Sequence, residues 1–165
     1  MGRTELFHVG IVVPDLEEAR AHFTDLLDLD WGPIVEVNNE VRDAEGNDSV
    51  VPRLRMSYSL TGPYIEVIEE QPGTPWVCNE HSNLHHIGFF SDDLLGNSAY
   101  LNSARCPLEI SGRDGEAARA VFTYHRDPLG VRIEHIDWQI LPMMEENMLA
   151  GGRRLETSGI RTSRL

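Results

Sequence analysis

The stretch Phe7-His8-Val9-Gly10-Ile11-Val12-Val13-Pro14-Asp15-Leu16 decides the fold of this chain, because a diverged copy of it returns in the second half. The copy, seventy-eight positions later, reads His85-His86-Ile87-Gly88-Phe89-Phe90-Ser91-Asp92-Asp93-Leu94. A second matched pair follows downstream, Ile65-Glu66-Val67-Ile68-Glu69 and Ile133-Glu134-His135-Ile136-Asp137. The sequence therefore contains an internal repeat with a His and a Glu at corresponding points of each half.

Each half of the repeat predicts the element order β-α-β-β-β. Residues 6–13 are apolar and rich in β-branched side chains, which indicates a buried strand. Asp15, with Glu18 three positions later, is typical of a helix start, and the apolar spacing carries that helix to about residue 28. The other strands predicted in the first half are 33–41, 53–60 and 64–69. In the second half we expect strands at 84–90, near 108, at 120–125 and at 131–137, with a helix over 93–103.

The composition is that of an ordinary globular protein, with 41% hydrophobic and 25% charged residues in a chain of 165. We expect a single domain over residues 1–138, with module one at about 5–70 and module two at about 84–138, and a C-terminal extension over 139–165. No apolar run approaches the ~20 residues of a membrane span, and a strand pattern at the N-terminus leaves no space for a signal peptide. Cys78 and Cys106 form no metal-binding or disulfide pattern, so we expect a cytoplasmic protein.

The charge balance limits the classes of molecule that we expect this protein to bind. Fourteen basic and twenty-seven acidic residues give a formal net charge of −13, which argues against nucleic acid or an anionic membrane as a partner. Lysine is absent from the sequence, which excludes mechanisms that need a Schiff-base lysine or a phosphate-loop lysine. The expected partner is a small-molecule substrate.

The His and Glu of each half predict a metal site. Buried imidazoles and carboxylates are costly unless they are paired or bound to a metal. Each residue alone has a simpler explanation, a core imidazole for the His or a surface carboxylate for the Glu, but both types recur in register with the repeat. Because side chains two apart in a strand share a face, two modules set side by side would bring four ligands into one cleft. The expected metal ligands are His8, Glu66, His86 and Glu134.

The neighbouring His85 is a rival for the second histidine ligand. The spacing His8-Val9-Gly10 matches His86-Ile87-Gly88 and therefore selects His86. A glycine two residues after each histidine is expected to leave open space beside the metal.

These motifs resemble the vicinal oxygen chelate superfamily, which includes glyoxalase I, methylmalonyl-CoA epimerase, extradiol dioxygenases and bleomycin-resistance proteins. The resemblance covers about residues 6–138 and rests on residues 8–16, 64–67, 84–89 and 127–134. It implies an α+β fold in which two βαβββ modules in tandem form a cupped mixed sheet around a metal cleft. It also places the metal at His8, Glu66, His86 and Glu134.

The resemblance also narrows the reaction. Dioxygenases of this superfamily typically use three ligands, His-His-Glu, whereas isomerases and epimerases have a fourth ligand, which Glu66 supplies. We therefore expect a divalent-metal-dependent isomerase, epimerase or lyase of the glyoxalase type, acting on a small carbonyl compound or thioester by proton transfer through an enediolate. Glu134 or Glu66 is the expected catalytic base. The metal is nickel, cobalt, zinc, manganese or iron, and mixed nitrogen and oxygen ligands do not select among them.

Three further residues are candidates for substrate binding. If Leu54 and its alternate neighbours face the helices, then Arg55 and Ser57 face the cleft and could bind an anionic group together with Arg132. Exposed arginines that balance an acidic protein are an equal alternative.

Two other functions stay open, a metal-free binding or resistance protein that sequesters a small natural product and an extradiol-type dioxygenase. The resemblance favours a homodimer, and the site lies either within one chain or between two.

Overall fold

The computed structural model describes residues 2–114 and 119–148. The first half contains β1 (Thr4–Val13), α1 (Leu16–Leu27), β2 (Val35–Asp43), β3 (Asp48–Tyr58) and β4 (Tyr64–Glu69). The second half contains β5 (Leu84–Ser91), α2 (Leu94–Ser103), β6 (Leu108–Asp114), β7 (Arg119–Arg126) and β8 (Arg132–Asp137). A 3-10 turn η2 (Trp138–Ile140) and the helix α3 (Leu141–Asn147) follow. The predicted β-α-β-β-β order is confirmed in both halves.

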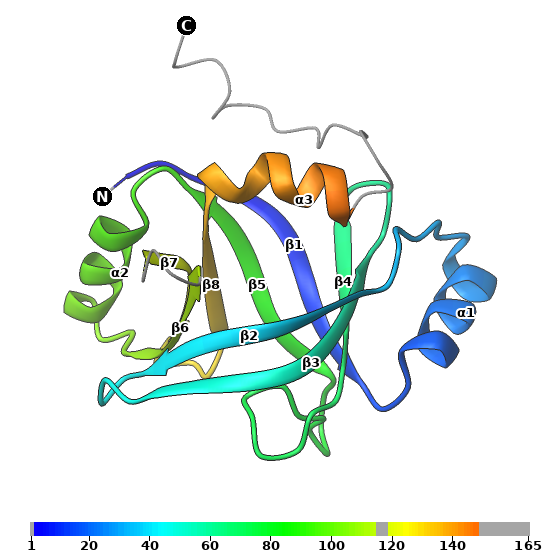
Figure 1. Ribbon diagram of the computed structural model, residues 1–165, viewed down its shortest axis with the longest axis horizontal. Helices are drawn as coiled ribbons and strands as arrows, with labels where there is room; N and C mark the ends of the chain where they lie inside the picture. Colours follow the sequence, from blue (N-terminus) through cyan, green and yellow to red (C-terminus); the bar gives the residue numbers. More distant parts are fainter. Residues whose placement is uncertain (1, 115–118, 149–165) are drawn as a thin grey trace, which may run out of the picture.

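The eight strands of the described residues form one closed sheet in the order β1-β4-β3-β2-β6-β7-β8-β5. β1 is parallel to β4 and β5 is parallel to β8, whereas the other neighbours are antiparallel. The predicted α+β fold with a mixed sheet is confirmed, and the sheet curves until its edges meet. Figure 1 shows α1 and α2 on opposite outer sides of this sheet.

The two long helices begin where the sequence predicts. Asp15 accepts a hydrogen bond from the Glu18 backbone N–H at 2.8 Å, and Asp93 accepts one from Gly96 at 2.9 Å. Such caps satisfy backbone donors that the first turn leaves unpaired. The buried side chains of Val13, Leu16 and Val67 hold α1 against the outer face of the sheet.

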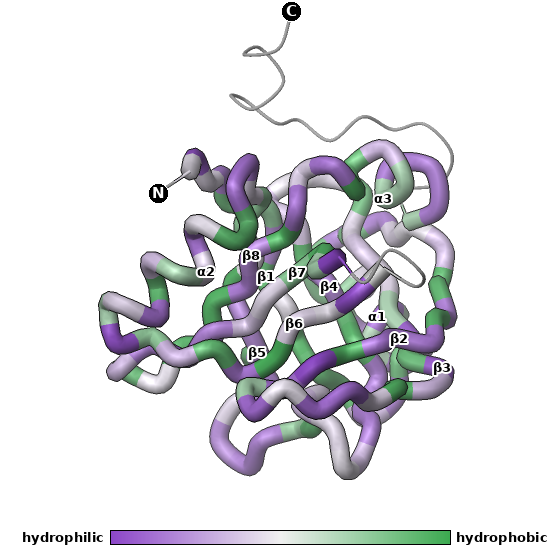
Figure 2. The backbone as a smooth tube through the Cα atoms, turned by 60° about the vertical axis from the view of Figure 1, so that its left-hand side comes forward, coloured by the Kyte–Doolittle hydropathy of each residue, from purple (hydrophilic) through white to green (hydrophobic). Residues whose placement is uncertain are grey.

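The main core lies inside the closed sheet. Polar and apolar residues alternate along the strands (Figure 2), as expected when one face is buried. The interior cluster takes large side chains from both halves, among them Phe7, Leu54, Trp76, Phe90 and Tyr124. Both modules therefore share one core.

The expected C-terminal extension is described as far as residue 148. Within it, Leu141 and Met144 of α3 are buried in the main core, and α3 lies across one end of the sheet (Figure 1). Residues 149–165 lie outside the described residues. Over 2–114 and 119–148, no helix has the length and apolar character needed to cross a membrane.

Candidate metal centre

Four neighbouring strands of the closed sheet carry the expected ligands. His8 lies on β1, Glu66 on β4, His86 on β5 and Glu134 on β8. The strand register pairs Gly10 with both Glu66 and His86. In the same way it pairs Gly88 with both His8 and Glu134. The repeat in the sequence thus becomes an approximate twofold arrangement in space.

The two glycines make room for the histidines. A Cβ atom on Gly10 would lie 2.0 Å from Cε1 of His86, and one on Gly88 would lie 2.2 Å from Cε1 of His8. Both distances are far below van der Waals contact. The expectation that these glycines leave open space beside the metal is therefore wrong. The imidazole of His86 fills the space beside Gly10, and that of His8 fills the space beside Gly88.

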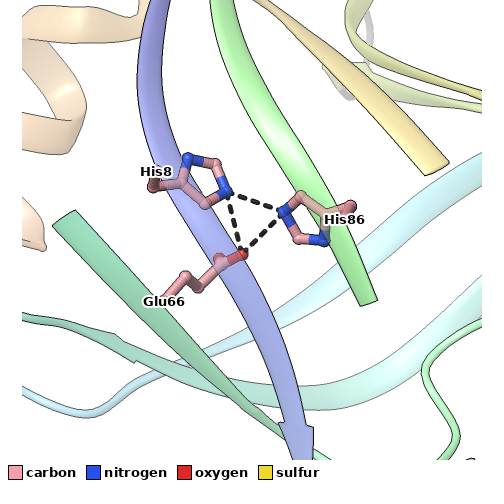
Figure 3. Close-up of side chains that lie close together, drawn as sticks. All are labelled: His8, Glu66 and His86. Carbon is pink, nitrogen blue, oxygen red and sulfur yellow. Dashed lines mark hydrogen bonds and ion pairs between the residues drawn. The ribbon is translucent and has the colours of Figure 1, made fainter. Parts of the chain in front are cut away.

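One chain brings the four side chains together. The Nε2 atoms of His8 and His86 are 2.7 Å apart. Glu66 Oε2 lies 3.3 Å from each of these nitrogens, as Figure 3 shows for His8, Glu66 and His86. On Glu134, Oε2 lies 3.2 Å from each of them. All four residues are at most 6% exposed, so the cluster is shielded from bulk water.

This geometry suits a divalent cation. At metal–ligand bonds of about 2.0–2.2 Å, neighbouring ligand atoms lie about 3.0–3.5 Å apart, close to the separations of 2.7–3.3 Å found here. Ligand atoms of His8, Glu66 and His86 lie within 4.8 Å of one another and could hold such an ion. Glu134 Oε2 is buried and makes no well-aligned hydrogen bond among the described residues, although both imidazole nitrogens lie 3.2 Å from it, which suits a ligand to a cation.

The four groups hold one another in charged forms. Burial alone would lower the pKa of His8, but the carboxylates of Glu134 and Glu66 outweigh it and raise the pKa to about 9. Burial alone would raise the pKa of each carboxyl, but the two imidazoles hold both values well below the usual range. The carboxylates are thus ready to bind a metal, whereas metal binding at the imidazoles must release protons.

Sequence reasoning missed two tyrosines at equivalent points of the halves. Tyr58 lies opposite Glu66 in the register and Tyr124 lies opposite Glu134. The Tyr58 hydroxyl donates a short hydrogen bond to Glu66 Oε1. The signal was present, because each tyrosine lies in the strand that precedes the repeated Glu. Burial and then the charge of Glu66 raise the pKa of Tyr58 well above its usual value, so the hydroxyl stays a donor.

His85, the rejected rival, supports the chosen ligand. Its Nδ1 lies 2.8 Å from Nδ1 of His86, and its Nε2 lies 2.9 Å from the Pro75 carbonyl oxygen. Burial, followed by the charges of Arg132 and His86, lowers the pKa of His85 to about 3. The Pro75 carbonyl oxygen and Arg132 both contact Nε2 of His85. The contact between the two Nδ1 atoms orients the His86 ring so that its Nε2 faces the cluster.

The expected substrate-binding residues lie elsewhere. Leu54, Met56 and Tyr58 face the interior, so Arg55 and Ser57 lie on the opposite face of β3. Arg55 pairs with Glu17 and Glu69 at 2.5 Å each.

The other two residues are held by structural contacts. Ser57 Oγ donates to the Gly32 carbonyl at 3.0 Å. Arg132 pairs with Glu109 at 2.6 Å and contacts His85. Arg55 and Ser57 thus lie away from the cavity, because alternation defines two faces of a strand, whereas tertiary structure decides which face lies inside.

A cavity of about 440 Å³ adjoins the cluster. Glu66 and Glu134 both line it, together with Tyr58 and Tyr124. The remaining wall is largely apolar. A ligand in this cavity would contact both carboxylates beside a largely apolar wall.

A family model described as the Glyoxalase/Bleomycin resistance protein/Dioxygenase superfamily matches residues 7–124. The chain belongs to this superfamily. The resemblance read from the sequence is thereby confirmed. Members of the superfamily are often enzymes, such as epimerases and dioxygenases, and they typically bind a divalent metal. No curated protein matches the chain.

Several solved structures share the fold. Methylmalonyl-CoA epimerase in complex with methylmalonyl-CoA and NH4+ is 19% identical, with a TM-score of 0.57 over 81% of this chain and 94% of that chain. A variant of the Streptomyces coelicolor epimerase in complex with 2-nitronate-propionyl-CoA is 18% identical, with a TM-score of 0.56 over 80% and 95%. The epimerase from Mycobacterium tuberculosis is 22% identical, with a TM-score of 0.50 over 80% and 86%. At these identities the similarity shows the fold alone.

Proposed function

We propose that this protein is a divalent-metal-dependent isomerase, epimerase or lyase that moves a proton at the carbon next to a carbonyl group. The proposed metal ligands are His8, Glu66, His86 and Glu134. The observation that carries the proposal is the convergence, inside the closed sheet, of two imidazole nitrogens 2.7 Å apart with one oxygen of Glu66 and one of Glu134, each 3.2–3.3 Å from both nitrogens. A bound divalent ion acts as a Lewis acid that polarises a substrate carbonyl and thereby acidifies the neighbouring C–H.

The two carboxylates are suited to different tasks. Glu66 is held by the Tyr58 hydroxyl at Oε1 while its Oε2 faces the histidines. Glu134 Oε2 also faces both histidines, but the opposing Tyr124 bonds with Trp76 instead of with Glu134, and the Glu134 side chain lines the cavity. We therefore assign the proton transfer to Glu134, which would accept the substrate α-proton at a carboxylate oxygen and return it to the deprotonated substrate to form the product. Glu66 takes no part in the proton transfer and serves only as a proposed metal ligand.

Metal analysis tests the site, and two substitutions test the roles. Protein purified without a tag is expected to contain a stoichiometric divalent ion by elemental analysis. Glu134→Gln is expected to abolish exchange of the substrate α-proton with deuterated solvent, by a factor of at least about 100, whereas Glu36→Gln on the surface leaves it unchanged. The role of Glu134 is wrong if its variant keeps both the exchange rate and the metal content of the wild type.

The apolar wall of the cavity also suits a second function, a metal-free binding protein that sequesters a small natural product. Elemental analysis separates the two, because such a protein needs no stoichiometric metal. A dioxygenase would instead consume oxygen in the presence of catechols and a bound ferrous or manganous ion.

The proposal includes a homodimer and a cytoplasmic location, which rest on the resemblance and on the composition. Light scattering of the purified protein tests the dimer. One chain supplies all four proposed ligands, so the proposed site does not depend on the dimer.

A further inference from the structure

The cavity beside the cluster has an apolar wall made by both halves of the chain. Its volume of about 440 Å³ accommodates roughly fifteen non-hydrogen atoms if each takes the ~30 Å³ of a water molecule. The side chains that make this wall include Leu54, Met56, Ile68, Trp76, Phe122 and Ile136. Such a surface gains free energy only from a ligand with apolar area to bury.

The helix α3 completes this wall. Met143 and Met144 both line the cavity, and α3 lies across this end of the closed sheet (Figure 1). Met144 is 3% exposed and Met143 is 42% exposed, so one side chain belongs to the core and the other is open to solvent. Methionine side chains adapt their shape to an apolar partner. The segment after β8 therefore adds apolar surface to the cavity wall.

Apart from the two glutamates, the charged side chains that line the cavity among the described residues are two arginines, and both already have partners. Arg113 and Arg119 line the cavity, but Arg113 pairs with Asp48 at 2.9 Å and Arg119 bonds to Gln139 at 2.6 Å. The chain contains no lysine and carries a formal charge of −13. A polyanionic ligand would thus approach an acidic protein whose two arginines at this wall are already engaged.

We infer that the substrate is an uncharged carbonyl compound that carries an aromatic or branched aliphatic group, and that α3 selects for this group. This inference rests on the proposed function for the carbonyl and adds the class of the substrate. The apolar group lies against the methionines of α3 and the wall beneath them, while the carbonyl faces Glu66 and Glu134. A coenzyme A thioester is disfavoured, because the two arginines that line this wall among the described residues are already paired, Arg113 with Asp48 and Arg119 with Asp137.

Two matched α-hydroxyketones test the inference by isothermal titration calorimetry. Acetoin and phenylacetylcarbinol share the reacting group and differ by a phenyl ring in place of a methyl group. Manganese-loaded protein is expected to bind phenylacetylcarbinol at least about tenfold more tightly than acetoin. Propionyl-CoA at the same concentration is expected not to displace it. Equal affinities for the two ketones, or displacement by propionyl-CoA, overturn the inference.

Substitutions in α3 test its part in the selection. Met144→Gln and Met143→Gln are expected to reduce the phenyl preference at least about threefold by placing an amide in the apolar wall. Met143 is partly exposed, so Met143→Gln is expected to fold. This variant therefore tests the role of α3 even if Met144→Gln fails to fold. The matched control is Glu146→Gln, on an exposed position of the same helix. An unchanged preference in Met143→Gln contradicts the role of α3.

The same titrations with EDTA-treated protein separate this inference from the proposed function. If the protein binds no manganese but still prefers the phenyl compound, the proposed metal chemistry fails and the apolar selection stands. If manganese binds at the cluster and the phenyl preference is absent, the inference fails and the proposed metal site stands.

Discussion

Replacing Gly88 with alanine tests whether the interlocked glycines and histidines build the metal site. The added Cβ would lie 2.2 Å from Cε1 of His8, 2.6 Å from Nδ1 and 2.8 Å from Nε2. Ordinary contact begins at 3.4 Å, so the imidazole or the strand must move by about 1.2 Å to restore it. Both strands are tied into the closed sheet by their neighbours, so the side chain is expected to take most of this displacement.

A shift of this size is large compared with the tolerance of a metal bond, which is about 0.2 Å. We therefore expect Gly88→Ala to weaken metal binding by at least about a hundredfold, at or beyond the upper end of the effect of losing a supporting contact to a ligand. Overpacking of the interior is expected to reduce the free energy of unfolding of the metal-free protein by about 1–3 kcal/mol. Calorimetric titration with manganese and urea denaturation measure the two effects separately.

The matched control is Gly112→Ala. A Cβ atom there would lie 1.7 Å from Cε1 of Phe122, so it clashes inside the same sheet without touching a proposed ligand. This variant is expected to lose comparable stability while its metal affinity stays within about threefold of the wild type. Wild-type metal affinity in Gly88→Ala, or an equal loss in both variants, would refute the reasoning.

Three further predictions concern the surroundings of the cluster. His85→Gln is expected to weaken manganese binding about 10–100-fold, because the ring contact that orients His86 is lost; unchanged affinity by calorimetry contradicts this. Tyr58→Phe removes a buried hydrogen bond to the ionised Glu66, so urea denaturation of EDTA-treated protein should show a loss of about 1–3 kcal/mol; a stability equal to that of the wild type counts against it. Burial lowers the pKa of His125 below the ordinary 6.5. The unfolded chain therefore binds this proton more readily, and the free energy of unfolding falls as the pH drops below about 6.5. His125→Gln is expected to flatten that slope, and an unchanged slope shows that His125 does not cause it.

The repeat explains why so much of the fold could be predicted from the sequence. The stretches around His8 and His86 each combine an apolar strand, a helix cap and an amphipathic or short helix, and local patterns of this kind depend little on the rest of the chain. The recurrence of Glu66 and Glu134 added the long-range information, because equivalent residues of a repeat occupy equivalent places in space. Both the order of the elements and the meeting of the four side chains follow from this.

The faces of β3 show where sequence reasoning stops. The alternation of Leu54, Met56 and Tyr58 with Arg55 and Ser57 was visible, but either set suits an interior. The sheet closes on itself, so its interior has to be filled with large apolar side chains, and the arginine is left to pair outside with Glu17 and Glu69. These partners lie on α1 and β4, and only the tertiary structure brings them to Arg55.

The partners of the cluster were hidden for a related reason. The hydrogen bond from Tyr58 to Glu66 depends on the register of β3 against β4, and a shift by one residue would send the hydroxyl to the other face. The contact of His85 with His86 depends on a register shift in β1 and β5 between Gly10 and Ile11. Neither register could be derived from apolar periodicity.

The approximate symmetry of the site fails at the tyrosines, and this failure bears on the chemistry. Tyr58 donates to Glu66, whereas the oxygen of Tyr124 accepts from Trp76 Nε1 at 3.4 Å, although the register places Tyr124 opposite Glu134. In a fully symmetric site the two carboxylates would be equally basic, and their side chains would be equally free to move. Proton transfer at a single carbon instead benefits when one carboxylate is held and the other can approach the substrate. The divergence of the two halves at this point therefore favours a division of labour between Glu66 and Glu134, and a variant that frees Glu66 should lose that division while it keeps the fold.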